Sequence, residues 1–195
     1  MENKFLVIVD LEATCWDNKT IEATKWQRQN SEIIEIGALK VSLDKEHYLE
    51  PIKEFDVFVK PIKHPVLSYF CKQLTSISQD NVDKGLMFPK AVESFKKEMF
   101  QDFDATLFGS WGKYDFNFMI EQCEENMVEV PFNTQKVINL KSLVATIKGW
   151  KKKGRGIKRT LEDLNMEFDG TPHRGIDDVR NTRRILLKVK EELNL

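Results

Sequence analysis

The chain has 195 residues, of which 41% are hydrophobic and 31% charged, and its formal net charge is −1. These values are typical of one globular domain with a substantial core, and no apolar run approaches the ~20 residues of a membrane helix. Residues 1–4 lack the layout of a signal peptide. Cys15, Cys71 and Cys123 show no CxxC spacing, which indicates reduced core thiols rather than zinc ligands and predicts a cytoplasmic location. The charge balance neither indicates nor excludes a polyanionic partner.

An acidic pair follows the first apolar segment. Residues 5–8 read Phe-Leu-Val-Ile, a run typical of a buried strand, and Asp10 and Glu12 come directly after it. Residues two apart on a strand project to the same side, so these carboxylates would repel each other while losing water. Their ionised forms then need a partner, and a divalent cation is the strongest candidate. The alternative is a solvated strand end at which two acids happen to lie.

The first half of the chain predicts three strands. A polar segment without clear periodicity at residues 16–30 predicts a loop, and the runs at 33–41 and 55–60 have the composition of strands. Because the connections are short, we expect the three strands to form an antiparallel meander.

The rest of the chain alternates helices with strands. Added to the meander, this order predicts an α/β fold whose sheet contains both parallel and antiparallel pairs. The expected elements are short helices and turns at 65–81, a helix from Pro89, a strand at 105–108, a helix with Phe116 and Cys123 on one face, a strand at 137–140, a helix through Ile147, a short helix at 160–164 and a last helix from Ile176.

Asp115 follows the fourth expected strand and the glycine-containing turn at residues 109–112. It should lie in the first turn of a helix, near the carboxyl edge of the sheet, where open α/β folds bind ligands. The alternative is a carboxylate that caps the helix or stabilises its dipole.

A histidine and an aspartate flank the start of the last expected helix. His173 lies in a glycine-containing loop, and Asp178 falls in the first helical turn, with Asp177 as a candidate helix cap. A histidine titrates near neutrality and can take a proton from water. The alternative is an ordinary surface histidine.

Four acids and one histidine, each at the end of a core element, fit two-metal hydrolysis of a phosphodiester. That chemistry uses two cations about 3.5–4 Å apart, which activate water and stabilise the leaving oxygen. Ligands that are all oxygen favour Mg²⁺ or Mn²⁺ over zinc. The predicted metal ligands are Asp10, Glu12, Asp115 and Asp178.

Three segments and Asp115 carry a resemblance to a known family. The segments are DLEATC at 10–15, LSYFCKQLT at 67–75 and PHRGIDD at 172–178. In this order and at these intervals they resemble the DEDDh 3′→5′ exonucleases of the ribonuclease H-like superfamily, and within it the Eri-1/histone-mRNA exonuclease group with its KapD-like bacterial members. The resemblance extends from about Phe5 to Leu187. It implies a ribonuclease H-like fold, a five-stranded mixed sheet flanked by helices, and a single exonuclease domain over residues 1–195.

The resemblance also implies a role for each motif residue. Asp10, Glu12 and Asp178 would hold the first metal, Asp10 would bridge to the second, and Asp115 would help place that second metal. His173 would be the general base for the attacking water. Together these five residues are the predicted catalytic set, and the product would be a nucleoside 5′-monophosphate from a free 3′ end.

Further residues are predicted to bind substrate. In the same group the terminal base is wedged by residues that match Phe70 and Leu74, and stacking of this kind tolerates any base and contributes about 1–3 kcal/mol per base. Core packing is the alternative for both. Phe116 follows Asp115 and either contacts the terminal nucleotide or belongs to the core. Leu11 and Ala13 complete the predicted substrate-binding set.

Two features lie beyond the shared motifs. A basic run holds Lys151, Lys152, Lys153, Arg155, Lys158 and Arg159, and it could draw a nucleic-acid strand toward the acids through phosphate contacts or be a solvated loop. The second motif, GSWGKYD at 109–115, is longer between Trp111 and Asp115 than in the animal relatives. We also expect no room for the extra N-terminal RNA-binding domain that some animal members carry.

The predicted function is a metal-dependent 3′→5′ exonuclease that acts on single-stranded RNA, or on RNA and DNA, with two Mg²⁺ or Mn²⁺ ions and no haem or nucleotide cofactor. No membrane association is expected, and protein partners are unknown. A DNA-directed proofreading or repair exonuclease is an alternative, because discrimination rests on contacts to the 2′-OH that the motifs do not display. A third alternative is an inactive RNA-binding relative, which would be expected to lose at least one of the five catalytic residues.

Overall fold

A five-stranded sheet forms the centre of the molecule, in a computed structural model that describes residues 4–17, 20–150 and 155–192. The strands lie in the order β3-β2-β1-β4-β5. Neighbours among the first three pair antiparallel, whereas β4 pairs parallel with β1 and with β5, so the expected meander and the mixed sheet are confirmed. The bounds are Phe5–Ala13 for β1, Ile33–Ser42 for β2, Pro51–Phe58 for β3, Thr106–Ser110 for β4 and Val137–Asn139 for β5.

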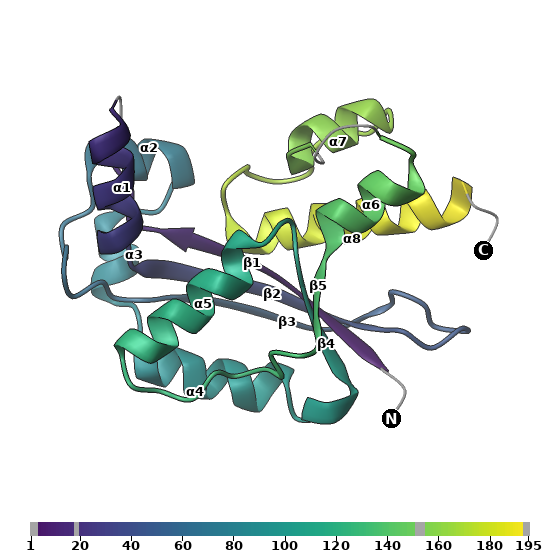
Figure 1. Ribbon diagram of the computed structural model, residues 1–195, viewed down its shortest axis with the longest axis horizontal. Coiled ribbons are helices and arrows are strands. Elements are labelled where there is room, and N and C mark those ends of the chain that lie inside the picture. Colours follow the sequence, from purple (N-terminus) through teal and green to yellow (C-terminus); the bar gives the residue numbers. More distant parts are fainter. Residues whose placement is uncertain (1–3, 18–19, 151–154, 193–195) are drawn as a thin grey trace.

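Helices cover both faces of the sheet (Figure 1). On one face lie α4 (Phe88–Met99) and α5 (Tyr114–Glu125), and on the other lie α6 (Leu140–Ile147), α7 (Ile157–Asp163) and α8 (Gly175–Glu192). Near the end of β1 are α1 (Ile21–Asn30), α2 (Tyr69–Thr75) and α3 (Gln79–Asp83), and a 3₁₀ turn at Phe103–Ala105 precedes β4. In these ranges no helix combines the length and apolar character needed to cross a membrane.

The alternation of side chains along β1 divides the core in two. Val7, Val9 and Leu11 belong to the cluster that packs with α4 and α5, whereas Leu6 and Ile8 belong to the cluster that packs with α8. Residues two apart share a face, so Asp10 and Glu12 continue the row of Leu6 and Ile8 on the α8 side. The apolar row thus ends in two acids below the start of α8.

The prediction of a loop at residues 16–30 is wrong, because α1 occupies Ile21–Asn30. Thr20 caps this helix by accepting a hydrogen bond from the Ala23 N–H at 3.1 Å. The helix lies on the surface, and the Trp26 ring anchors it by edge contacts with Trp16 and His64, at 4.9 and 5.3 Å between centroids. A helix held through one aromatic residue needs no continuous apolar stripe, so its periodicity is weak.

Smaller differences concern the ends of elements. β1 continues to Ala13 because it pairs with β2 that far, so the acidic pair lies within the strand and not after it. α7 begins at Ile157, three residues before its predicted start, and Lys151–Lys153 lie outside the described residues. Asp177 is not a helix cap: it lies inside α8, and its carboxylate accepts the N–H of Thr171 at 2.9 Å, which fastens the preceding loop to the helix.

Candidate active site

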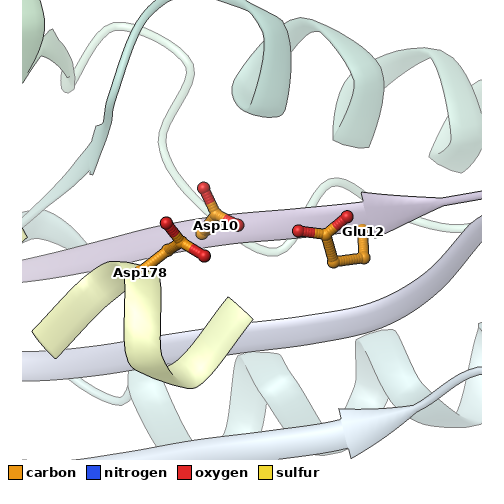
Figure 2. Close-up of side chains that lie close together, drawn as sticks. All are labelled: Asp10, Glu12 and Asp178. Carbon is orange, nitrogen blue, oxygen red and sulfur yellow. The ribbon is translucent and has the colours of Figure 1, made fainter. Parts of the chain in front are cut away.

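Three carboxylates meet where α8 crosses β1. Asp10 and Glu12 come from the strand and Asp178 from the first turn of α8, and one oxygen of each lies within 4.8 Å of the others (Figure 2). Glu12 and Asp178 are each only 8% exposed. The expected grouping of these three acids is therefore present in the structure.

The electrostatics of this cluster fit a bound cation. Burial, reinforced by the neighbouring carboxylates, raises the pKa of Asp10 well above its usual range and that of Glu12 to about 9. Burial raises the pKa of Asp178 to about 7. One oxygen of Asp178, Oδ2, is buried and has no hydrogen-bond partner among the described residues. Acids that have no cationic side-chain partner within the described part of the chain are suited to a divalent ion held by oxygen ligands.

Asp115 lies beside the three clustered acids but outside their closest grouping. It occupies the first turn of α5, and its Oδ1 accepts the N–H of Leu11 at 3.3 Å. Burial raises its pKa to about 6, and its charge in turn raises the pKa of Asp10. The carboxylate therefore lies close enough to Asp10 for the two charges to interact, and it could help hold a second cation through one direct or water-mediated contact.

His173 lines the same cleft. Its backbone is left-handed, with φ 63°, in the turn that leads into α8, and its side chain is exposed. The cleft has a volume of about 610 Å³, and its walls include all five predicted catalytic residues as well as Tyr114, Lys158, Arg159 and Pro172. The structure thus brings together residues that are as far apart in the sequence as Asp10 and Asp178.

The predicted substrate-binding residues divide into two groups. Phe70 and Leu74 are 39% and 36% exposed on α2, so neither is a core residue. α2 is fastened to the end of β1, where the Ser68 hydroxyl donates to the carbonyl of Cys15 at 2.5 Å and the Cys71 thiol to that of Ala13 at 3.6 Å. The exposed wedge is therefore held beside the strand that carries Asp10 and Glu12.

The other substrate-binding predictions fall on more enclosed positions. Leu11 lines the cleft although it is almost wholly buried, and Ala13 packs partly against the core. Phe116 also packs against the core, with its ring in edge contact with Phe108 at 6.4 Å between centroids, and it is not among the residues that line the cleft. This geometry favours core packing over nucleotide contact for Phe116.

Sequence reasoning missed Tyr114, Glu35 and Arg174. Tyr114 stands at the mouth of the cleft with its ring stacked on Phe118 at 5.1 Å. Glu35 is fully buried and bonded to Arg174, next to His173. A signal was present for Glu35, since an acid inside the apolar run 33–41 needs a partner.

The raised pKa values predict an unusual pH dependence for the metal-free protein. Between about pH 4 and pH 7 the folded state keeps a proton on Asp178 that the unfolded chain has lost, so folding stability falls as the pH rises. Asp178→Asn cannot ionise there. In EDTA we expect its melting temperature to exceed that of the wild type near pH 8 and to match it near pH 4. Calorimetry measures both, and parallel pH profiles would contradict the assignment.

The fold and the site together define a class: a ribonuclease H-like domain of the DEDDh type, in which four acids and one histidine share a cleft. The family model described as "Exonuclease" matches residues 7–186. The chain belongs to this exonuclease family, and the expected DEDDh membership is confirmed.

Named relatives agree with this assignment. Human "3′-5′ exoribonuclease 1" is 31% identical over 195 residues, which cover 96% of this chain and 53% of that protein. "ERI1 exoribonuclease 2" from Xenopus laevis is 27% identical over 202 residues, covering 93% of this chain and 28% of that protein. The chain thus spans about half the length of the first relative and less than a third of the second.

A solved structure matches over nearly its whole length. The nuclease domain of 3′hExo, described as a DEDDh family member bound to rAMP, superposes with a TM-score of 0.82 at 26% identity, covering 97% of this chain and 93% of that one. The prediction of a five-stranded, ribonuclease H-like mixed sheet flanked by helices is therefore confirmed.

Proposed function

We propose that this domain is a metal-dependent 3′→5′ exonuclease that removes nucleoside 5′-monophosphates from single-stranded RNA. The observation that carries the proposal is the convergence of Asp10, Glu12 and Asp178 within 4.8 Å, in a cleft that also holds Asp115 and His173. An inactive RNA-binding relative would not need to keep and assemble all five. The same arrangement would act on DNA, and the names of the relatives favour RNA.

Each residue has a distinct task in this reaction. Asp10, Glu12 and Asp178 would hold one divalent cation, and Asp10 and Asp115 would help hold a second. When bound, the two cations activate water and stabilise the leaving oxygen. His173 takes the proton from the attacking water on its imidazole, and because the side chain is exposed it can release that proton to solvent. Oxygen ligands alone make Mg²⁺ or Mn²⁺ the proposed ions.

The decisive experiment is digestion of 5′-labelled single-stranded RNA and DNA with Mg²⁺, Mn²⁺ or EDTA. We expect a ladder that shortens from the 3′ end, protection by EDTA and faster cleavage of RNA. An intact substrate under every metal condition would favour the binding-protein alternative. Equal rates on RNA and DNA would support the exonuclease activity but contradict the preference for RNA. Cuts inside the substrate would contradict the exonuclease activity itself.

Phe70 supports recognition of the terminal base in this proposal. Its exposed ring on α2 offers a stacking face, and loss of one base–aromatic stack costs about 1–3 kcal/mol. We expect Phe70→Ala to raise KM for a single-stranded oligonucleotide by roughly 5- to 150-fold. Steady-state kinetics measure this, with Tyr48→Ala, a distant exposed aromatic, as the control. An unchanged KM for Phe70→Ala would contradict the role of this ring in stacking on the terminal base.

Lys158 supports contact with the phosphate backbone. It is exposed, lines the cleft, and makes no ion pair within the described ranges, whereas Arg155 and Arg159 pair with Asp163. We expect Lys158→Ala to weaken RNA binding a few-fold and to reduce the salt dependence of binding by about one counterion. Fluorescence anisotropy across a salt series measures both. Lys90→Ala, on α4, is the control, and an unchanged salt slope for Lys158→Ala would contradict the role.

Two broader expectations complete the proposal. The three cysteines are buried and free, which supports a reducing location such as the cytoplasm. The extent of the protein as a single exonuclease domain over residues 1–195 stays a prediction. Cell fractionation tests the location, and recovery of the activity in an extracellular fraction would contradict it.

A further inference from the structure

Glu35 is a further buried acid near the cleft, in addition to the four predicted metal ligands, and metal binding does not explain its position. It lies directly opposite Glu12 in the antiparallel pairing of β1 with β2, and it is 0% exposed. Directly opposed residues project to the same face of a sheet, and two like charges there destabilise it. Glu35 is also outside the group of acids whose oxygens lie within 4.8 Å. A different task must account for a carboxylate at this position.

The hydrogen bonds of Glu35 show what that task is. Oε1 accepts a hydrogen bond from Nε of Arg174 at 3.0 Å and lies 2.9 Å from Nη2 of the same guanidinium in an ion pair. The other oxygen accepts the backbone N–H of Gly175 at 3.0 Å. Both oxygens of one carboxylate therefore bind two consecutive residues, and these directly follow His173. Bidentate bonding of this kind fixes orientation as well as distance.

The surroundings make the anchor rigid. Gly175 is the first residue of α8, and its backbone packs closely against Gly37 on β2. A Cβ at position 37 would lie only 2.2 Å from the carbonyl carbon of Gly175. The Arg174 guanidinium also lies over the Phe58 ring, 5.1 Å from its centroid, and its Nη2 is 3.8 Å from Asp56. Contacts to β2 and β3 thus determine where α8 starts.

We infer that Glu35 and Arg174 form a positioning pair for the exonuclease reaction. The pair holds the left-handed turn of His173 on one side and, through the first turn of α8, the carboxylate of Asp178 on the other. It sets the distance between the histidine that takes the proton and the acids that hold the metal, without touching substrate. This inference rests on the proposed function of the cleft.

Variants of both partners test the pair. In Glu35→Gln and in Arg174→Gln we expect kcat on single-stranded RNA to fall about 10- to 100-fold, as for other groups that orient metal ligands, while KM changes less than twofold. The double variant Glu35→Gln/Arg174→Gln should lose no more than the worse single variant, because both changes break one unit. Mn²⁺ titration calorimetry should show about tenfold weaker binding in each variant, independently of turnover.

The matched control is Glu54→Gln. Glu54 on β3 binds Arg180 of α8 through two contacts, at 2.8 and 2.6 Å, so it also joins this helix to the sheet, but at an exposed site away from His173. We expect its kcat and Mn²⁺ affinity to equal those of the wild type. Additive losses in the double variant, or equal losses in Glu54→Gln, would overturn the positioning role.

The proposed function can fail separately. An inactive wild type would overturn that function, whereas the calorimetric comparison would still decide whether Glu35 and Arg174 position the metal ligands. If the wild type is active and both Glu35→Gln and Arg174→Gln keep its kcat and Mn²⁺ affinity, only the positioning role of the pair is overturned. Should Arg174→Gln fail to fold because it leaves the buried carboxylate of Glu35 without its cation, Glu35→Gln still tests the pair, since the side chain of Arg174 is 24% exposed and its charge can reach solvent.

Discussion

Asp10→Ala is expected to abolish exonuclease turnover, with kcat reduced by about 1,000-fold or more. Charge stabilisation by a metal ion is worth several kcal/mol, and each ~1.4 kcal/mol is a factor of ten in rate. Asp10 lies among the other acids of the cleft, and the charges of Asp115, Asp178 and Glu12 all raise its pKa. Its loss therefore removes a ligand from both proposed cations, whereas loss of Glu12 removes a ligand from one.

A graded comparison tests this reasoning. Single-turnover rates for Asp10→Ala and Glu12→Ala should both fall, and the former should fall further. Mn²⁺ calorimetry should show weaker binding in both. Asp80→Ala removes an exposed acid of α3 that pairs with Lys84 and does not line the cleft, and it should leave both measurements unchanged. A larger loss in Glu12→Ala than in Asp10→Ala would contradict the bridging position of Asp10.

His173→Ala is expected to lower kcat by about 100- to 10,000-fold while leaving metal affinity as in the wild type. A positioned general base contributes on this scale, and His173 lies outside the group of acids that binds the cation. Its side chain is exposed in the cleft, so the variant should fold normally. Added imidazole should restore part of the lost rate by occupying the space of the missing ring.

The control for this prediction is His47→Ala. His47 is an exposed histidine that pairs with Glu50 at 3.1 Å, and its removal should change neither turnover nor metal binding. Full activity in His173→Ala would contradict the proposal that His173 is the general base. Reduced Mn²⁺ affinity in that variant would instead show that the imidazole takes part in metal binding.

Much of the fold could be predicted because its elements obey local rules. β2 is predominantly apolar, and it is buried along its whole length. α5 and α8 follow turns and carry apolar residues at helical spacing. The candidate catalytic residues could be predicted for a related reason: acids at the ends of apolar elements need compensation, which a shared cation can supply, and their order resembles a known family.

The remaining features depend on contacts that are distant in sequence. α1 has no stripe that local periodicity could reveal, since one ring, Trp26, holds it against Trp16 and His64. The Glu35–Arg174 pair joins residues 139 positions apart. Phe116 has the residue type of a base-stacking side chain, but the direction of its side chain toward Phe108 depends on the rotation of α5 against the sheet. Composition carries none of this information.

The crossing of α8 over β1 has a consequence for biosynthesis. The cluster takes two acids from the first strand and its third from the last helix, so a growing polypeptide cannot assemble it until Asp178 has left the ribosome. Contacts of such long range form late and slow the folding of a domain. The nascent chain therefore emerges next to ribosomal RNA and messenger RNA without a complete metal site. The proposed nuclease activity is therefore absent until the helix that carries Asp178 has been synthesised and has packed against β1.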